Sequence, residues 1–427
     1  MNLLIKNSHV IDPHSGLDGR FDILIKNKKI IDIKKNIKDK NAKLINASDM
    51  ITAPGFIDMH VHLREPGQEH KETIETGARA AAAGGFTSLA CMPNTSPVND
   101  SSGITKYIVS RAQKSADVNV FPIASLSVKQ KGKALTEMAD LIQSGAIAFS
   151  DDGMPIQNSE LMRRGLEYAK QWEALIIDHC EDLDLSSNGV MNEGHYSYLL
   201  GLKGIPDYSE DVMVARNIIL AEKTDSRLHL AHISTKGSVE IIRRAKEKGV
   251  KITSEVTPHH LFLDDSLLSS YSTDLKVNPP LRTKQDNKSL INAVKTGVID
   301  VFATDHAPHS PDEKDVEFNA APFGINGLET AVSLILDKLV HTEVISMNQC
   351  VDMFSCRPAK ILGLNSKGKI EKGADADLTV IDPQKKITVD VHKFRSQSRN
   401  NPFHNWELKG SPVMTIVGGK IVYSDLH

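Results

Sequence analysis

The middle of the chain alternates between short apolar runs and helical patterns, and this alternation restricts the fold more than any other feature. Eight runs have the length and the flanking turns of β-strands. Helical patterns lie between them, for example in residues 74–83, 210–220 and 239–248. Strands in alternation with helices indicate a parallel sheet, and eight of them match an α/β fold closed as a (β/α)8 TIM-type barrel. The strand candidates are 51–63, 86–92, 118–123, 146–150, 174–178, 227–231, 251–256 and 298–304.

The two ends of the chain have a different texture. Residues 1–53 alternate apolar and polar side chains between turn signals, which is typical of short antiparallel strands. The other end repeats this texture, with a turn at 373–377 and a hairpin at 413–423. Neither end could bury a core alone. We therefore expect a small β-sandwich domain formed jointly by residues 1–53 and 368–427, and a barrel over residues 54–367.

Charge and composition narrow the class of ligand. The 427 residues include 51 basic and 54 acidic ones, for a formal net charge of -3, and the two signs are well mixed. Such a pattern offers no basic stripe for nucleic acid and no polybasic membrane anchor, so we expect neither partner. The first residues turn polar too soon for a signal peptide, and no apolar run is long enough for a bilayer. These observations predict a cytoplasmic protein that acts on a small molecule.

The cysteines do not form a recognisable framework. Their number and spacing match neither a set of disulfides nor a zinc knuckle, so we expect free thiols. Cys180 directly follows His179, and this pair would also fit a nucleophile. We favour a small apolar filler at a strand end. The four cysteines are Cys91, Cys180, Cys350 and Cys356.

The most informative motif is GFIDMHVHLREPG at 55–67, where the first strand ends. Side chains alternate across a strand, so His60 and His62 point to one face and can reach a single metal ion. Arg64 follows just beyond the strand, where its guanidinium could hold a substrate carboxylate through two parallel hydrogen bonds. An isolated pair of this kind also fits two ordinary packed histidines. The interpretation therefore depends on the other strand ends.

Polar residues recur at the same relative position of the other strands. In a parallel barrel the carboxyl ends of the strands meet at one face, where active sites are built. Any single residue of this kind also fits a turn, a helix cap or a packed histidine. The recurrence favours a metal site, and histidine with carboxylate suits Zn²⁺, with enough ligands for two ions and a bridging carboxylate. The set comprises His60, His62, Asn94, Asp151, Asp152, His179, His232, Asn278 and Asp305.

Three motifs carry a resemblance to a known family. The segment 55–67, together with VNPPLR at 277–282 and ATDHAPH at 303–309, resembles the dihydroorotases of the amidohydrolase superfamily, and the similarity extends over nearly the whole chain. The resemblance implies reversible interconversion of N-carbamoyl-L-aspartate and (S)-dihydroorotate plus water in UMP biosynthesis. It also implies that a zinc-activated hydroxide performs the reaction, on a barrel that carries a β-sandwich.

The resemblance implies a role for each residue of the set. His60 and His62 would bind one zinc ion, and His179 and His232 a second, which gives one or two Zn²⁺ per chain. Asp305 would contact the metal and act as the general base. The segment 310–322 would be a mobile loop that covers the site. The implied substrate contacts are His62, Arg64, Asn94, Asn278 and His309, with the main chain at Phe323 and Gly324.

One departure from the superfamily concerns the end of the fourth strand. Many members bridge their metals there with a carboxylated lysine, whereas this chain has FSDDG at 149–153. The pattern resembles the bacterial type I dihydroorotases, in which an aspartate bridges. We assign the bridge to Asp152, which abuts Gly153 as it does in those relatives. Asp151 is assigned a hydrogen-bonding or turn role.

Two rival functions are compatible with the same fold. A hydantoinase or allantoinase would share the barrel, but Arg64 and the neighbouring amides favour an acidic pyrimidine, and the missing lysine argues against these enzymes. A metal-free chain could instead serve only as a partner of aspartate carbamoyltransferase, with which some relatives assemble. Such a chain would be expected to have lost ligands. From the resemblance we expect three kinds of partner, namely a small-molecule substrate, aspartate carbamoyltransferase and further copies of the chain in a homo-oligomer.

Overall fold

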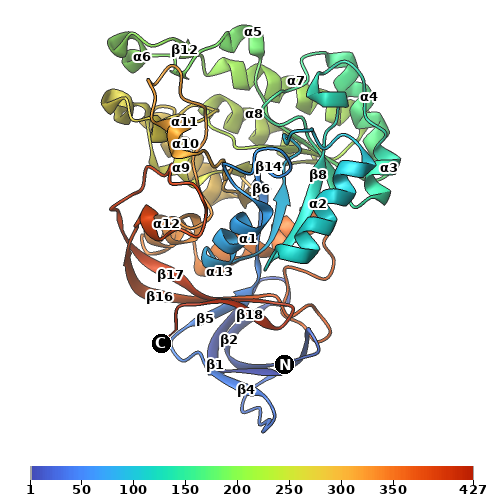
Figure 1. The fold of residues 1–427 in the computed structure, drawn as a ribbon, viewed down its shortest axis with the longest axis vertical. Coiled ribbons are helices and arrows are strands. Elements are labelled where there is room, and N and C mark those ends of the chain that lie inside the picture. Colours follow the sequence, from blue (N-terminus) through green and yellow to red (C-terminus); the bar gives the residue numbers. More distant parts are fainter. Residues whose placement is uncertain (1, 427) are drawn as a thin grey trace.

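The computed structural model describes residues 2–426, and its centre is a sheet of eight parallel strands in chain order (Figure 1). A backbone bridge between Val61 and His306 joins the first strand to the segment after the last one. The sheet therefore closes as a TIM-type barrel, and eight strands are present where they were predicted, except that residues 51–54 of the first candidate pair with strands from the two chain ends instead. The barrel strands are β6 (Phe56–Val61), β7 (Phe86–Cys91), β8 (Asn119–Ala124), β9 (Ala148–Phe149), β10 (Leu175–Asp178), β13 (Leu228–Leu230), β14 (Ile252–Val256) and β15 (Val301–Phe302).

Helices cover the outside of the barrel, and those predicted near 74–83, 210–220 and 239–248 are present as α1, α7 and α8. Helix α1 begins at a capping box, in which Thr73 and Thr76 satisfy each other's backbone N–H groups. Its alanines allow close packing. The longer helices are α1 (Ile74–Ala83), α2 (Ser102–Ser115), α3 (Met138–Gln143), α4 (Ser159–Lys170), α6 (His195–Leu200), α7 (Tyr208–Thr224), α8 (Lys236–Glu247) and α10 (Lys284–Thr296). The shorter ones are α5 (Leu183–Ser186), α9 (Pro258–Phe262), α11 (Pro311–Lys314), α12 (Ala331–Ile335), α13 (Met347–Val351) and α14 (Arg357–Ile361).

Both chain ends join one further sheet, at the end of the molecule where the N- and C-termini lie (Figure 1). Strand β1 pairs antiparallel with β2, but it pairs in parallel with β4 and β5. The sheet is therefore mixed, and not all-antiparallel as the sequence predicts. The chain reverses from β1 to β2 and again from β2 to β3, so β4 and β5 run in the same direction as β1. The strands are β1 (Leu3–Asp12), β2 (Leu17–Lys26), β3 (Lys29–Lys34), β4 (Lys43–Asn46), β5 (Ile51–Pro54), β16 (Leu378–Thr388), β17 (Glu407–Val417) and β18 (Lys420–Ser424).

The terminal sheet has a hydrophobic cluster of its own, to which Leu3 and Ile23 contribute from one chain end and Val380 and Ile416 from the other. The expectation that neither end buries a core alone agrees with this shared cluster. The exact domain limits stay a prediction. A small two-stranded sheet of β11 (Met191–Asn192) and β12 (Gly204–Ile205) lies apart from both large sheets.

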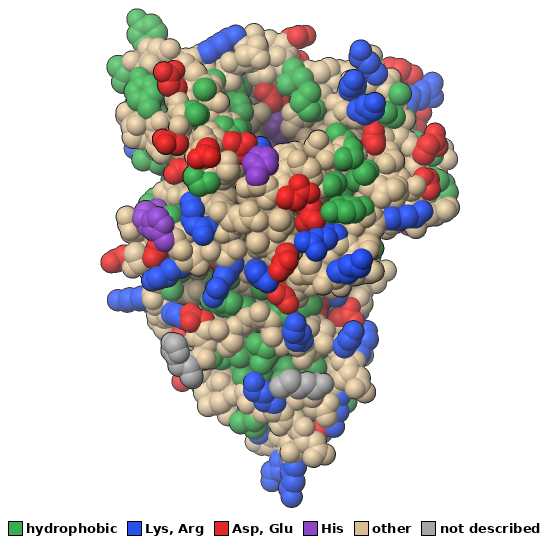
Figure 2. Space-filling model, in the orientation of Figure 1, with side chains coloured by type: hydrophobic (Ala, Val, Ile, Leu, Met, Phe, Trp, Pro, Cys, Tyr) green, Lys and Arg blue, Asp and Glu red, His purple; other side chains and the backbone are tan. Residues whose placement is uncertain are grey.

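The distribution of charged side chains and the state of the cysteines agree with what the sequence predicts. Acidic and basic side chains are interspersed over the face in Figure 2. The four cysteines are free thiols, and burial raises the pKa of Cys180 well above its usual value. A buried thiol of this kind is a poor nucleophile, which favours the filler interpretation. Between residues 2 and 426, none of the helices has both the length and the apolar character needed to cross a membrane.

The chain changes from one sheet to the other at Gly55, between β5 and β6. A Cβ atom at this position would lie 2.2 Å from Oγ1 of Thr87 on the neighbouring strand. Backbone and side chain therefore approach more closely here than any other residue would allow. This close approach explains the glycine that opens the GFIDMHVH motif.

We expect Gly55→Ala to lower the free energy of unfolding by about 1–3 kcal/mol, because the added methyl group overpacks the site. Urea denaturation would measure the effect. The control is a double-mutant cycle with Thr87→Ala, which removes the nearest atoms, so the double variant should be more stable than the sum of the two single changes predicts. Strict additivity would contradict the steric explanation.

Candidate metal centre and active site

The predicted ligands come together in a cavity of about 350 Å³ at the carboxyl ends of the barrel strands. His60 is fully buried, and His309 lies behind Arg64 in contact with its guanidinium. Parallel strands explain this convergence, because all their carboxyl ends open on the same face. The predicted residues that line the cavity are His62, Arg64, Asn94, Asp152, His179, His232, Asn278, Asp305, Phe323 and Gly324.

Asp152 lies at the centre of the histidines. Its Oδ1 atom is 3.4 Å from Nε2 of His60, 3.5 Å from Nε2 of His232 and 3.8 Å from Nδ1 of His179. Its Oδ2 atom is 3.4 Å from Nε2 of His62. Oδ1 thus faces three histidines and Oδ2 faces the fourth, so both oxygens are directed at the cluster, and the bridging role of Asp152 stays a prediction. Although burial alone would raise the pKa of Asp152, the surrounding histidines lower it well below its usual value.

Asp305 faces the same cluster from the segment that follows β15. Its Oδ1 atom is 3.0 Å from Nε2 of His62 and 3.5 Å from Nε2 of His60. Burial opposes ionisation, but contacts with these histidines lower the pKa of Asp305. The carboxylate is therefore ionised near neutral pH and is able to accept a proton.

Backbone strain accompanies several of these positions. Arg64, His232 and Asp305 adopt positive φ angles of 61°, 29° and 45°, in the left-handed region that such residues rarely occupy. Strained backbone of this kind persists only where the surrounding structure enforces it, and it clusters at functional sites. Here each strained residue follows a barrel strand and turns its side chain into the cavity or the cluster.

The histidine ring orientations fit a metal ion. Nδ1 of His60 is 2.7 Å from a Glu255 oxygen, and Nδ1 of His62 is 2.8 Å from Oδ1 of Asn94. Nε2 of His179 is 2.9 Å from Oε2 of Glu181. In each case the outer nitrogen has an oxygen acceptor, so the inner nitrogen is left as a ligand.

Unpaired buried atoms indicate the same site. Among the described residues, Nε2 of His60 and Oδ1 of Asp152 are buried without a hydrogen-bond partner, although both face the cluster. Buried polar atoms are normally paired, so two facing orphans call for a cation between them. Two three-residue groups have the spacing of metal ligands: His60, Asp152 and His232, and His60, His62 and Asp305. The residues present therefore fit a divalent metal cofactor.

Glu255 is a part of this centre that the sequence analysis missed. It is fully buried on β14, and its carboxylate also contacts Nε2 of His229 at 3.1 Å and accepts a hydrogen bond from the backbone N–H of His232. It thus holds both His60 and the loop of His232. The available signal was an acidic residue inside a predicted barrel strand, where a carboxylate is rarely buried unless it is paired.

Glu181 is a second missed residue. Besides His179, its Oε2 atom accepts a hydrogen bond of 2.8 Å from the side-chain amide of Asn278. Asn278 and Asn94 were predicted to contact substrate, and both line the cavity, but each amide also supports the histidine cluster. Glu181 follows His179 by two residues, and this spacing in a polar strand end was the signal for it.

The two aspartates that end the fourth strand have different surroundings. Whereas Asp152 faces the histidines, Asp151 accepts hydrogen bonds from Ser125 Oγ at 2.7 Å and from the backbone N–H groups of Leu126 and Ser127. Asp151 therefore holds the loop after β8. This arrangement is the one expected from its assignment as a hydrogen-bonding residue.

The predicted carboxylate-binding side of the cavity is built around Arg64. Its Nε atom donates to the backbone oxygen of Pro308 at 3.2 Å, and its Nη2 atom is 3.4 Å from Nε2 of His309. That same His309 nitrogen is 2.9 Å from the backbone oxygen of Phe323. Burial lowers the pKa of Arg64 to about 10 and that of His309 to about 3, so at pH 7 the arginine is charged and the histidine is neutral.

The segment 310–322 was predicted to be a mobile cover, and in the structure it contains α11. Lys314 donates hydrogen bonds to the backbone oxygens of Pro322 and Thr273, and Lys276 donates to that of Phe318. Two lysines thus tie the segment to residues 273–276 and to itself. Its mobility stays a prediction.

We expect Glu255→Gln to weaken binding of a divalent metal ion by about 10–100-fold, because loss of the carboxylate behind His60 lowers the basicity of the imidazole and loosens its orientation. Competition with a chelator would measure the affinity. Glu247→Gln, at an exposed position of α8, is the matched control. Equal metal affinity of the two variants would contradict the role of Glu255.

Comparisons with known proteins agree with this geometry. A model for dihydro-orotase-like proteins matches residues 49–238, and an amidohydrolase family model matches residues 240–423. The dihydroorotase of Geobacter metallireducens is 53% identical over 424 residues, which are 99% of this chain and 100% of that protein. The dihydroorotase of Acetivibrio thermocellus is 49% identical over 98% of both chains.

Solved structures show the same fold. The dihydropyrimidinase from Brevibacillus agri NCHU1002 aligns with a TM-score of 0.88 and 25% identity, over 100% of this chain and 95% of that one. The L-hydantoinase (dihydropyrimidinase) from Arthrobacter aurescens aligns with a TM-score of 0.90 and 24% identity, over 100% and 96%. The resemblance inferred from the motifs is therefore confirmed, and the chain belongs to the dihydroorotase family of the amidohydrolases.

Proposed function

We propose that this protein is a dihydroorotase, which interconverts N-carbamoyl-L-aspartate and (S)-dihydroorotate plus water in the biosynthesis of UMP. The observation that carries the proposal is the position of Arg64. Its guanidinium is buried and charged in the cavity that also holds the histidine cluster, and among residues 2–426 no carboxylate lies within ion-pair distance of it. A buried cation without a carboxylate partner in the protein fits a substrate that brings its own carboxylate.

The proposal also specifies the metal cofactor. We infer one or two Zn²⁺ ions, because the donors are nitrogen and oxygen atoms without thiolate. A bound metal lowers the pKa of a water molecule and polarises the carbonyl that the water attacks. The proposed ligands are His60, His62, Asp152, His179, His232 and Asp305, with Asp152 as the bridge.

The protein's own groups position the substrate and move the proton. Arg64 holds the carboxylate, and Asn94, Asn278, His62 and His309, with the main chain of Phe323 and Gly324, surround the ring in the proposed complex. Orientation of this kind places the ring carbonyl next to the attacking water. In ring opening Asp305 takes a proton from that water and gives it to the leaving ring nitrogen. In ring closure the same carboxyl group protonates the departing hydroxyl.

We further propose a cytoplasmic homo-oligomer with aspartate carbamoyltransferase as its partner. That enzyme makes N-carbamoyl-L-aspartate, so the two activities are consecutive. The support for these proposals is the family and the reaction. An assay of the isolated, zinc-loaded chain with dihydroorotate, dihydrouracil and hydantoin tests the proposed function. We expect dihydroorotate to be strongly preferred, whereas equal use of an uncharged cyclic amide would contradict the proposal.

For Arg64→Ala we expect a loss of about 2–5 kcal/mol in transition-state binding of dihydroorotate, because a desolvated charge pair is broken. Steady-state kcat/KM would measure this loss, and metal analysis should give a zinc content near that of the wild type. Arg79→Ala is the matched control, since Arg79 is an exposed residue paired with Glu75 on α1. A normal kcat/KM of Arg64→Ala would remove Arg64 from the site.

For Asp305→Asn we expect a loss of rate of about 10²–10⁴-fold or more in both directions, because the amide cannot take up the proton. The metal held by His179 and His232 should remain, and calorimetry should still detect dihydroorotate binding. Asp312→Asn, at an exposed position of α11, serves as the control. Substantial turnover by the zinc-loaded Asp305→Asn enzyme would reassign the base, with His309 as the next candidate.

A further inference from the structure

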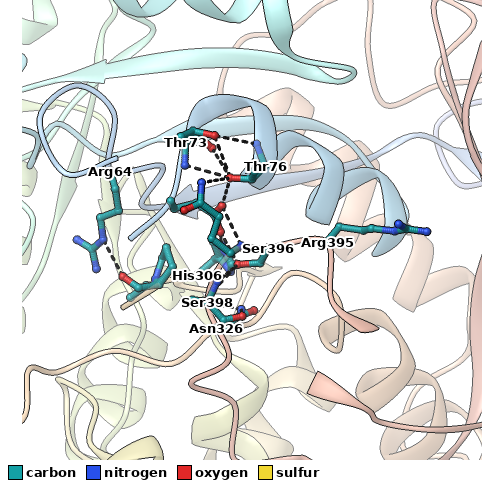
Figure 3. Close-up of polar contacts among 12 residues, drawn as sticks. Arg64, Thr73, Thr76, His306, Asn326, Arg395, Ser396 and Ser398 are labelled. Atoms are coloured by element: carbon teal, nitrogen blue, oxygen red, sulfur yellow. Dashed lines mark hydrogen bonds and ion pairs between the residues drawn. The ribbon is translucent and has the colours of Figure 1, made fainter. Parts of the chain in front are cut away.

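The connection between β16 and β17 leaves the terminal sheet and reaches the active-site end of the barrel. Its residues 395–401 run beside the segment that follows β15. The backbone N–H of Asn326 donates to the Asn400 oxygen at 2.9 Å, and the side chain of Asn326 donates to Ser398 Oγ at 2.8 Å. Figure 3 shows Ser396, Ser398 and Asn326 grouped beside the start of α1. A part of the chain far from the barrel strands in sequence therefore lies directly behind the site.

Two carboxylates, one half-buried and one buried, fix the base of this connection. Glu329 accepts hydrogen bonds from the backbone N–H groups of Arg395 at 2.7 Å and Ser396 at 3.0 Å. Glu72, which is fully buried just before α1, accepts from the hydroxyl of Ser396 and from the backbone N–H of Gln397. Hydrogen bonds to carboxylates are among the stronger ones, and here they hold three consecutive residues, so residues 395–397 form a firmly held support.

Asn400 extends from this support to the wall of the cavity. Its side-chain amide donates to the backbone oxygens of Ala307 at 3.1 Å and Gly324 at 2.9 Å. Its Oδ1 atom accepts a hydrogen bond of 3.2 Å from the backbone N–H of His309. The side chain is 3% exposed and both of its amide hydrogens and its oxygen are used. One side chain therefore ties residues 307–309 to residue 324.

The residues that Asn400 joins are those that shape the carboxylate-binding side of the cavity. Ala307 and Gly324 line the cavity. Pro308, which follows Ala307, accepts a hydrogen bond from Arg64 through its backbone oxygen and so orients that side chain. The two segments approach so closely that a Cβ atom on Gly324 would lie 2.6 Å from the oxygen of Ala307. The spacing between them thus sets where Arg64 and the main chain of Phe323 stand.

We propose that Asn400 is a positioning residue, which fixes the distance between residues 307–309 and Gly324 and so holds the Arg64 pocket in the shape that fits the substrate carboxylate. The inference rests on the proposed function, since it concerns the same pocket. Asn400 does not touch the reacting atoms. Its effect should therefore appear in substrate affinity more than in the chemical step.

The test compares Asn400→Ala with Asn401→Ala in the zinc-loaded full chain. Asn401 is equally buried in the same connection, but its side chain contacts Asn326, Thr330 and Phe403. We expect Asn400→Ala to raise the KM for dihydroorotate at least about tenfold, because small misplacements of binding groups are costly, with kcat changed much less. Asn401→Ala should lower the melting temperature to a similar extent and leave KM within about twofold, a change too small to reflect lost positioning. Zinc content should equal that of the wild type in both.

Hydrogen–deuterium exchange separates this inference from the proposed function, because it needs no substrate. We expect faster exchange of the amides of Ala307, His309 and Gly324 in Asn400→Ala than in Asn401→Ala. If Asn400→Ala does not fold, Asn400→Ser gives the same comparison. Unchanged KM and exchange in the Asn400 variant, or an equal rise of KM in both variants, would overturn the positioning role. A wild-type enzyme inactive on dihydroorotate would instead overturn the proposed function, while the exchange result still decides the role of Asn400.

Discussion

The arrangement of the site depends on one buried carboxylate, that of Asp152, surrounded by four histidines. Taking an anion out of water is costly unless cations or donors compensate it. The histidines supply that compensation from the ends of three strands, β6, β10 and β13, with contacts of 3.4 to 3.8 Å. The closed barrel is what allows this, because only a parallel sheet brings the carboxyl ends of so many strands to one point. Electrostatics at the centre and closure of the barrel therefore support each other.

Around this centre, hydrogen-bonding side chains fix the ring orientation of three of the histidines. Glu255, Asn94 and Glu181 take the outer nitrogens of three histidines, so the inner nitrogens point at Asp152. On the Arg64 side of the cavity the backbone is supported in a similar way, since the Pro308 oxygen accepts a hydrogen bond from Arg64 and Asn400 holds the residues on either side of Pro308. The terminal sheet thus contributes to the active site through its connection as well as closing one end of the molecule.

Much of this could be predicted from the sequence because it depends on local periodicity. The eight barrel strands, helix α1 and the position of each histidine and aspartate at a strand end follow from the alternation of apolar runs and helices. Pairings between distant segments have no such local signal. The parallel neighbours of β1 depend on how the hairpin of β2 and β3 folds back, and Asn400 meets Ala307 from 93 residues further along the chain. Glu255 was missed because an acidic residue in a strand is normally a surface residue.

Anomalous diffraction at the zinc edge, from crystals of the zinc-loaded protein, tests the central claim most directly. We expect metal density within bonding distance of the Asp152 carboxylate and of the histidines around it, His60, His62, His179 and His232. The peaks should fade in Asp152→Ala, because this substitution removes the carboxylate that the ions are proposed to share. Zinc peaks bound to other side chains, or peaks that persist at full height without the Asp152 carboxylate, would contradict the account.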